Sequence, residues 1–305
     1  MNLHEDKASF SQVLEDTAGH FGFEDIGIVE KDYFVTLFLK KITERIPGVI
    51  FKGGTSLSKC YKAINRFSED IDLNVETEAA KLTEGQRKKL KQDIVSIIDE
   101  LNFLLVNPEQ IRSRRDFNRY VVDYQSTTAL PFLKQYIIIE TAVQIKSFPT
   151  TEMDAGNYVY DFLSAINAED GITKYGLEPF KVKVQSIERT FIDKVFALAD
   201  YYLDGNLEGH SRHVYDLYKL YPSIVFDEGF GHLVSEVREV RKEHITCHSA
   251  QDHINIPEIL QKIFAENFYK SDYEKITTTL LFEEAPYAEA AAIISRVISD
   301  GYFNT

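Results

Sequence analysis

The sequence contains few cysteines, and it lacks an apolar segment long enough to cross a membrane. Only two cysteines, Cys60 and Cys247, occur among 305 residues, so a disulfide framework is not indicated and a reducing compartment is compatible. No apolar run approaches the ~20 residues that span a bilayer, and the start of the sequence lacks a basic segment followed by an apolar one. We therefore expect a cytoplasmic protein without a membrane anchor.

Positive charge is also scarce. The formal net charge is −14, which argues against a protein that coats nucleic acid through its overall field, because phosphate binding needs concentrated Lys and Arg. Two local clusters remain as candidates for binding a polyanion: one precedes a predicted strand, and the other has the spacing of an exposed helix face. They are Arg112, Arg114, Arg115 and Arg119, and Arg87, Lys88, Lys89 and Lys91.

The apolar residues that are present follow two different periods. Helix and strand periods alternate up to residues 150–185, and helix-period segments dominate afterwards. The chain, with 305 residues of which 44% are apolar, also exceeds the usual span of about 100–200 residues per domain. We predict an α+β fold with two domains: residues 1–180, a mixed sheet with N-terminal helices, and residues 181–305, a helical domain.

The individual elements are predicted from the same periods. Strands are expected at residues 49–51, 70–75, 119–124 and 135–144, and the last two are expected to pair. Helices are expected at residues 10–17, 29–45, 84–101, 187–202, 212–220 and 256–268. A further short helix, capped by Thr55 or Ser56, is expected to reach residue 63.

Two acidic residues on the strand at 70–75 carry the strongest chemical signal. Asp70 and Asp72 are two positions apart, so a strand presents both carboxylates on one face, about 7 Å apart. Such like charges are tolerated when a divalent cation lies between them, and Mg²⁺ is usually held by one or two carboxylates plus substrate phosphates. The pattern predicts a Mg²⁺ or Mn²⁺ site.

A glycine pair precedes this acidic strand. Gly53 and Gly54 let a backbone come close to another group, and the helix start at Thr55 and Ser56 offers unpaired amides to phosphate oxygens. Each feature alone has an ordinary explanation, a turn for the glycines and surface polarity for the acids. Their order along the chain favours a site for a metal-bound nucleoside triphosphate.

The same stretch resembles the signature region of the AbiEii-type nucleotidyltransferases, which belong to the DNA-polymerase-β-like superfamily. The resemblance covers Glu30-Lys31-Asp32-Tyr33, Phe51-Lys52-Gly53-Gly54-Thr55-Ser56-Leu57-Ser58-Lys59 and Arg66-Phe67-Ser68-Glu69-Asp70-Ile71-Asp72-Leu73. It implies a polymerase-β-like mixed sheet flanked by helices, with Asp70 and Asp72 as metal ligands. It also implies a nucleotide-binding set of Lys52, Gly53, Gly54, Thr55, Ser56, Lys59, Arg66, Ser68 and Lys194.

A third carboxylate from a later strand is implied by the superfamily. Glu140 is the candidate, because an ionised group among the apolar residues around it is costly unless it is paired or metal-bound. Asp123, on the preceding strand, is the competitor. An exposed position on a half-solvated sheet is the alternative explanation for Glu140.

A second stretch is similar to the same family in its helical half. It comprises Gln185-Ser186-Ile187-Glu188-Arg189-Thr190-Phe191-Ile192-Asp193-Lys194-Val195-Phe196-Ala197-Leu198 and Arg212-His213-Val214-Tyr215-Asp216-Leu217-Tyr218. The similarity places Lys194 and Asp216 in the active site. Lys194 lies on an apolar helix, where a cation needs a phosphate or carboxylate partner. Asp216 could orient Lys194, or Lys194 could hold the triphosphate, and a structural ion pair is the alternative.

The resemblance implies an enzyme that transfers a nucleoside monophosphate from a nucleoside triphosphate to an acceptor hydroxyl. It further implies the toxin of a type IV toxin–antitoxin or phage-defence (abortive infection) pair, restrained by an antitoxin from a neighbouring gene, with the 3′ end of tRNA as acceptor in some relatives. Two alternatives stay open. One is a transferase that modifies a small molecule of the aminoglycoside kind or a protein, and the other is a non-catalytic binding protein on the same fold.

Overall fold

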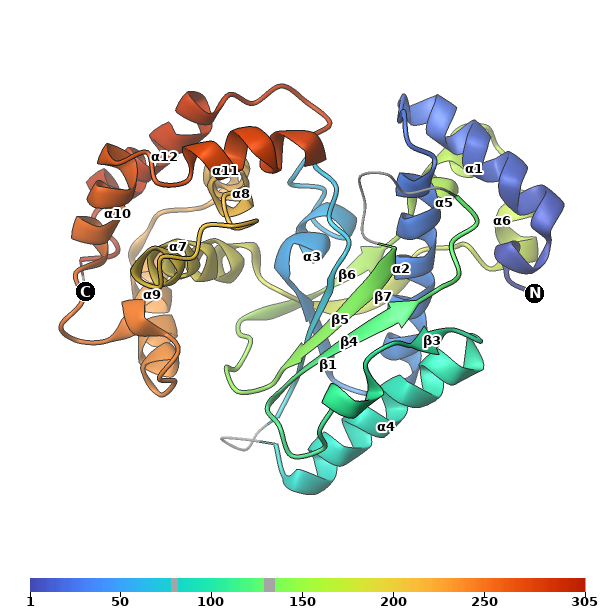
Figure 1. Cartoon of the computed structure of the whole chain (residues 1–305), viewed down its shortest axis with the longest axis horizontal. Coiled ribbons are helices and arrows are strands. Elements are labelled where there is room, and N and C mark those ends of the chain that lie inside the picture. The colour runs from blue at the N-terminus through green and yellow to red at the C-terminus, as the bar shows by residue number, and fades with distance from the viewer. Residues whose placement is uncertain (78–81, 129–134, 305) are drawn as a thin grey trace. The chain divides into compact units, whose positions relative to one another are not determined.

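The computed structural model describes residues 1–77, 82–128 and 135–304, and Figure 1 shows the whole chain. The chain divides into two compact units, which are described separately. The first unit is Met1–Cys60, Glu69–Gln144 and Thr151–Val184, and the second is Tyr61–Ser68, Ile145–Thr150 and Gln185–Thr305. Two short segments of the second unit, Tyr61–Ser68 and Ile145–Thr150, thus lie between segments of the first unit in the sequence. A single division point along the chain therefore does not separate the two units.

A seven-stranded sheet forms the centre of the first unit, in the order β3-β4-β5-β2-β1-β7-β6. The pairs β2–β5 and β1–β7 are parallel, whereas β1–β2, β4–β5 and β3–β4 are antiparallel. The predicted mixed sheet is therefore confirmed. The strands are β1 Val49–Lys52, β2 Ile71–Val75, β3 Leu104–Leu105, β4 Phe117–Asp123, β5 Tyr136–Ala142, β6 Thr150–Ala155 and β7 Phe180–Gln185.

The central strands owe their form to two different apolar patterns. In β5, Ile137, Ile138 and Ile139 are all buried, the continuous run expected of a strand that is covered on both faces. In β4, Tyr120 and Val122 are buried and alternate with more exposed neighbours, the period of a strand with one solvated face. The predicted pairing of these two strands is confirmed by their antiparallel register.

Helices surround the sheet of the first unit. Helix α2 is buried at most positions between Val29 and Leu39 and packs against α1, α4 and α5. Helix α3 packs on β1 and β2, and it is only seven residues long. The helices of this unit are α1 Lys7–Phe21, α2 Gly27–Arg45, α3 Gly53–Lys59, α4 Glu84–Glu100, α5 Tyr158–Ala165 and α6 Glu169–Tyr175.

The second unit is built mainly of helices, as predicted. Helix α7 is its central element, because it packs against α8, α9 and α10 and buries Phe191, Val195 and Leu198. Helix α12 closes the core against α8 and α10. The helices are α7 Ile187–Leu203, α8 Arg212–Leu220, α9 Glu228–Lys242, α10 Ile256–Ala265, α11 Lys270–Lys275 and α12 Tyr287–Asp300.

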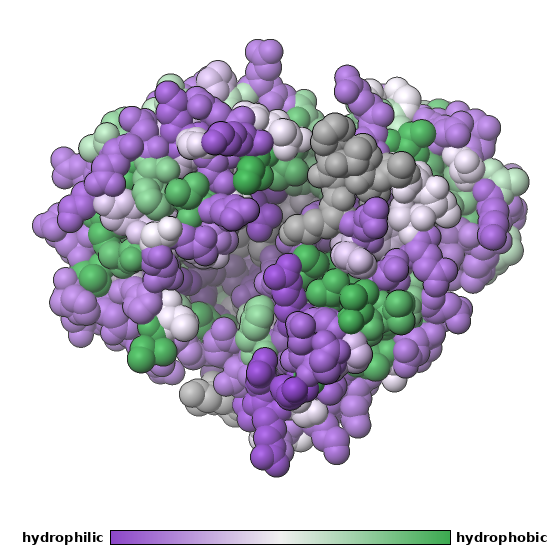
Figure 2. Space-filling model, viewed as in Figure 1, coloured by the Kyte–Doolittle hydropathy of each residue, from purple (hydrophilic) through white to green (hydrophobic). Residues whose placement is uncertain are grey.

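Polar side chains dominate the face shown in Figure 2, and apolar residues appear there only in small groups. Among the residues that the structure describes, no helix combines the length and the apolar character needed to traverse a bilayer.

Candidate active site

A row of four charged residues crosses four adjacent strands of the first unit. The strand registers pair Lys52 with Asp72, Asp72 with Glu140, and Glu140 with Arg119. Residues directly opposite one another in a sheet project from the same face. The sequence identified these residues separately, and only strand pairing brings the two carboxylates together between two cations.

The carboxylate of Asp72 lies directly against the backbone of Gly53. A Cβ at position 53 would come within 2.0 Å of Asp72 Oδ2, and the φ of Gly53 is +76°. Any other residue would therefore collide with the carboxylate and adopt a strained backbone. The sequence suggested that the glycine pair and the acidic strand form one site. In the fold, Gly53 and Asp72 are in contact.

Helix α3 begins at Gly53, three or four residues earlier than a cap at Thr55 or Ser56 would place its start. Gly53 and Gly54 form its first turn, so Thr55 and Ser56 lie inside the helix and do not cap it. Ser56 Oγ donates instead to the carbonyl oxygen of Gly53, at 2.9 Å. Lys52 takes the cap position without a capping hydrogen bond from its side chain. The expectation that Thr55 or Ser56 caps this helix is wrong, as is its predicted end at residue 63.

Asp70, immediately before β2, has a buried oxygen atom that lacks a partner. Its Oδ1 accepts no hydrogen bond from the described residues, a state that is costly for a carboxylate unless a cation or donor is supplied. No group of three or more His, Cys, Asp and Glu side chains is gathered for metal binding within the described ranges. Two carboxylates still fit Mg²⁺, which takes its remaining ligands from phosphates and water.

The two candidates for the third carboxylate occupy different places. Glu140 is the register partner of Asp72, and its Oε1 lies 3.6 Å from Arg119 Nε, with the Glu140 side chain 31% exposed. Asp123 pairs with Tyr136, four positions along β4 from Arg119, which corresponds to about 13 Å along the strand. The geometry therefore favours Glu140.

The second unit contains a buried cluster around Asp216, which is fully buried. Arg66 donates to both of its oxygens, from Nε at 2.7 Å and from Nη2 at 2.8 Å. Lys194 Nζ donates to Oδ2 at 2.6 Å. Burial alone would raise the pKa of Asp216, but the charges of Arg66 and Lys194 and their hydrogen bonds hold it far below its usual range. Asp216 is therefore ionised at neutral pH.

Lys194 stands in a positive environment despite its bond to Asp216. Burial lowers the pKa of Lys194, Asp216 raises it, and the charges of Arg66 and Arg212 lower it further. His213 Nδ1 is 3.4 Å from Lys194 Nζ. Burial, followed by the charge of Lys194, holds the pKa of His213 well below its usual value. The imidazole is thus neutral near pH 7 and can accept a hydrogen bond from the ammonium group.

Three cations of the predicted nucleotide-binding set, Lys59, Arg66 and Lys194, have carboxylate partners within the protein. Lys59 is buried, and its Nζ donates to Asp32 Oδ1 and, at 2.7 Å, to Thr36 Oγ1. Arg66 is engaged by Asp216. Lys52 and Ser68 are half-buried, whereas Thr55 and Ser56 are buried. The sequence signals charge at these positions, but it does not tell which charge a neighbouring segment neutralises.

The two basic clusters identified in the sequence are partly neutralised by carboxylates. Arg87 pairs with Asp116 and Arg114 with Glu84, each at 2.7 Å. Arg119 faces Glu140, and Lys89 pairs with Asp93. Neither cluster therefore offers an uninterrupted positive surface.

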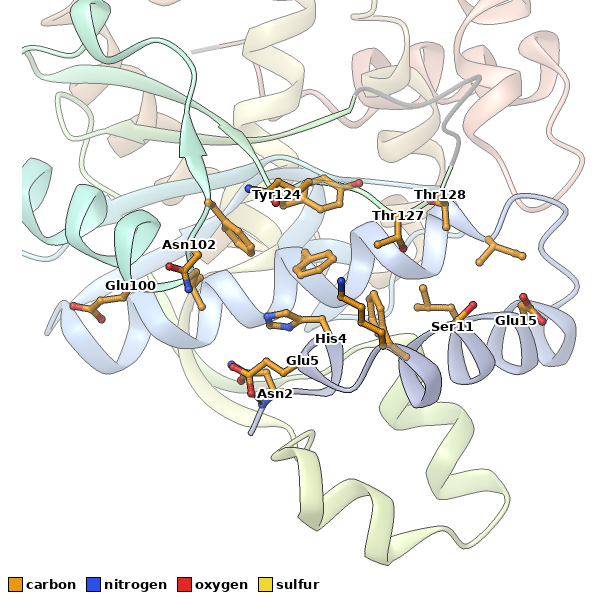
Figure 3. A pocket seen from close by; sticks show the side chains of 18 residues that line it. Asn2, His4, Glu5, Ser11, Glu15, Glu100, Asn102, Tyr124, Thr127 and Thr128 are labelled. Carbon is orange, nitrogen blue, oxygen red and sulfur yellow. Dashed lines mark hydrogen bonds between the residues drawn. The ribbon is translucent and has the colours of Figure 1, made fainter.

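A separate cavity of about 680 Å³ lies in the first unit. Figure 3 shows His4 and Tyr124 among its lining side chains, with Thr127 and Thr128 beside them. None of its lining residues belongs to the predicted catalytic or nucleotide-binding set.

A mixed sheet that sets carboxylates side by side on adjacent strands, next to a helix opened by glycines, is the arrangement of a nucleotidyltransferase. Comparison with known proteins agrees. The family model described as nucleotidyl transferase AbiEii toxin, type IV TA system, matches residues 43–294. The chain therefore belongs to the AbiEii family, the nucleotidyltransferase toxins of type IV toxin–antitoxin systems.

A solved structure shares the fold. MenT4, a nucleotidyltransferase toxin from Mycobacterium tuberculosis H37Rv, aligns with a TM-score of 0.55 over 94% of this chain and 88% of its own, at 14% sequence identity. At that identity the likeness concerns the fold alone. Comparison with curated proteins finds no significant match.

Proposed function

We propose that the protein transfers a nucleoside monophosphate from a nucleoside triphosphate to an acceptor hydroxyl, with Asp70 and Asp72 as ligands of Mg²⁺ or Mn²⁺. The observation that carries the proposal is the buried Oδ1 of Asp70, which has no hydrogen-bond partner among the described residues and directly precedes the strand whose Asp72 lies against Gly53. Once bound, the metal would neutralise charge on the triphosphate and polarise the phosphate that is transferred.

The neighbours of these carboxylates have separate tasks in this proposal. Glu140 is the third carboxylate, because strand pairing sets it beside Asp72. Lys52, the partner of Asp72 on the other side, contacts the triphosphate. Gly53 and Gly54 let phosphate oxygens approach the backbone, since they have no side chains. Thr55 is buried and would contribute through its amide in the first turn of α3, whereas the amide of Ser56 lies one position beyond that turn.

Lys194 is proposed to bind phosphate, and Asp216 is proposed to position it. The positive charges of Arg66 and Arg212 around Lys194 favour an anion beside it. Asp216 is not the base that activates the acceptor, because it is ionised with a strongly lowered pKa and both of its oxygens accept charged hydrogen bonds. Arg66 is then a positioning residue and not a nucleotide ligand, and Lys59 has the same status through Asp32.

We further propose the 3′ end of tRNA as acceptor, with a toxin activity that the cognate antitoxin counteracts. The net charge of −14 and the ion pairs within both basic clusters support an acceptor that is held at one end and not along its backbone. The same observations make a protein hydroxyl or a small cationic molecule the second candidate.

One experiment tests both parts. Purified protein and its Asp72→Ala variant are incubated with Mg²⁺, each labelled nucleoside triphosphate, and total cellular RNA or protein. Label on tRNA that requires Asp72 supports the full proposal, and label on protein or a small molecule supports the second candidate. Absence of label with every acceptor, or equal labelling by the variant, would contradict a transferase that depends on these carboxylates.

A further inference from the structure

Helix α2 contains three consecutive charged residues that are withdrawn from solvent. Glu30 and Lys31 are fully buried, and the side chain of Asp32 is 11% exposed. Burying ionised groups is costly unless each one is paired and hydrogen-bonded. Successive helix positions point about 100° apart, so each of the three residues needs a partner in a different direction.

Lys31 reaches the segment that leads into the acidic strand. Its Nζ lies 2.5 Å from Glu69 Oε2, and the side chain of Glu69 is 14% exposed. Glu69 directly precedes Asp70, whose buried Oδ1 accepts no hydrogen bond within the part of the chain that the structure describes. The ion pair between Lys31 and Glu69 therefore holds the backbone directly before Asp70.

Asp32 holds the helix that begins at the glycine pair. Its carboxylate accepts hydrogen bonds from Lys59 Nζ and, at 2.9 Å, from the amide of Tyr158. Lys59 is the last residue of α3, and Gly53, which lies against Asp72, is the first. Asp32 thus holds the C-terminal end of α3. The N-terminal end of the same helix contacts Asp72.

Glu30 organises a third segment, the one that follows β4. Its carboxylate accepts hydrogen bonds from Ser126 Oγ at 2.6 Å, from Thr127 N at 2.8 Å and from Thr128 Oγ1 at 2.6 Å. Thr127 and Thr128 line the cavity in Figure 3. Glu30 thus supports the segment after β4, whereas Lys31 and Asp32 support the segments that lead to Asp70 and Gly53.

We propose that Lys31 and Asp32 are positioning residues for the metal site: through Glu69 and Lys59 they hold Asp70 and Asp72 in the geometry that binds the divalent cation. The inference rests on the proposed function. Two neighbouring carboxylates repel each other before the cation arrives, so rigid supports on both sides are needed to keep them at binding distance. Outer residues that orient metal ligands typically contribute about 10–100-fold to metal affinity or activity.

The test measures cation binding directly as well as turnover. Mn²⁺ binding is followed by electron paramagnetic resonance, with and without a non-hydrolysable nucleoside triphosphate, alongside the Mg²⁺ concentration for half-maximal transfer. Lys31→Met and Glu69→Gln are expected to weaken cation binding about 10–100-fold, with a smaller change in nucleotide KM at saturating Mg²⁺. The double variant is expected to match the single ones, because both remove the same ion pair.

Lys41→Met is the matched control. Lys41 lies on the same helix, and its ammonium pairs with the exposed Glu44 at 3.1 Å, so its removal is expected to leave cation binding unchanged. Thermal unfolding of every variant separates loss of fold from loss of the site. If Lys31→Met and Glu69→Gln unfold, Lys31→Arg keeps the charge and alters the geometry, and it is expected to shift the Mg²⁺ requirement by about threefold to tenfold.

The outcomes distinguish the inference from its basis. Wild-type cation affinity in the folded Lys31 and Glu69 variants, while Asp72→Ala loses cation binding, overturns the positioning role and leaves the proposed function intact. If Lys31→Met and Glu69→Gln unfold, an unchanged Mg²⁺ requirement in the folded Lys31→Arg variant also overturns the positioning role. Absence of any Mg²⁺-dependent transfer by the wild-type protein would overturn the proposed function itself.

Discussion

Two groups of carboxylates, Asp70 and Asp72 at the start of β2 and Asp216 on α8, represent two opposite ways of placing negative charge in one chain. Asp70 leaves a buried oxygen without a partner among the described residues, and Asp72 has Glu140 as its strand neighbour. Asp216, by contrast, has both oxygens engaged by Arg66 and Lys194. Under the proposed function the first arrangement binds a cation, whereas in the second the cations come from the chain itself.

This difference predicts that the two sets respond oppositely to removal of charge. Where a carboxylate repels its neighbour, losing it should impair chemistry and spare the fold. Where a buried carboxylate neutralises two cations, losing it leaves uncompensated buried charge, and the fold should suffer first. The variants below test that contrast.

Asp72→Asn is expected to have the largest effect on activity. Loss of a metal ligand should lower kcat/KM for nucleotide transfer by at least about 10³-fold, which equals about 4 kcal/mol of transition-state stabilisation. The melting temperature should change little, because the neighbours of Asp72 on the adjacent strands are a carboxylate, Glu140, and a cation, Lys52. Residual activity within about tenfold of wild type would remove Asp72 from the metal site.

Asp216→Asn is expected to have the largest effect on stability. Without this carboxylate, the buried side chains of Arg66 and Lys194 lose their shared partner, which should lower the free energy of unfolding by about 3–5 kcal/mol. Denaturant titration measures the loss, and Glu44→Gln, which breaks an exposed ion pair, serves as control. If the variant is as stable as the control, the cluster around Asp216 is not a structural unit.

The pH dependence of that stabilisation sharpens the same comparison. The pKa of Asp216 lies far below its usual value of 3.8 in the folded protein, so its contribution is fully present above about pH 3.8 and is lost as the pH falls further. The stability difference between wild type and Asp216→Asn should therefore be constant from about pH 8 to 5. Denaturant titrations at a series of pH values measure it, and a difference that already shrinks near pH 6 would contradict this assignment.

Glu140→Gln should have a smaller effect, because Asp70 and Asp72 would still hold the cation. We expect kcat/KM to fall by about 10–100-fold, with Asp123→Asn, the matched change on β4, near wild type. Parallel transfer assays with both variants decide between the two candidates for the third carboxylate. A larger loss in Asp123→Asn than in Glu140→Gln would reverse the order proposed from strand register.

Local patterns in the sequence were sufficient for several elements. The helix expected at residues 212–220 is α8. The strands expected at residues 119–124 and 135–144 correspond to β4 and β5, which pair as predicted. These patterns report which face of an element is buried, and that depends on neighbours a few residues away. The family resemblance came from other stretches, chiefly residues 51–59 and 66–73.

The predictions that depended on partners distant in sequence fared differently. Helix α3 starts at Gly53 and not after the expected cap, and its first residue lies against Asp72, which is 19 positions further along the chain. The sequence marked Lys59 and Arg66 as charged, but only the fold showed that Asp32 and Asp216 neutralise them. The charges of α2 were visible as part of the family resemblance, with no indication that each supports a different segment.

By itself, the sequence determined the kinds of chemistry available to this protein: adjacent carboxylates, a backbone opened by glycines, and a lysine on an apolar helix. Only the tertiary structure decided which charges are neutralised from within the chain, as Asp216 is by Arg66 and Lys194. The physical reason is that an ion pair depends on distance in space, and strand register and helix packing bring together residues that the chain keeps far apart.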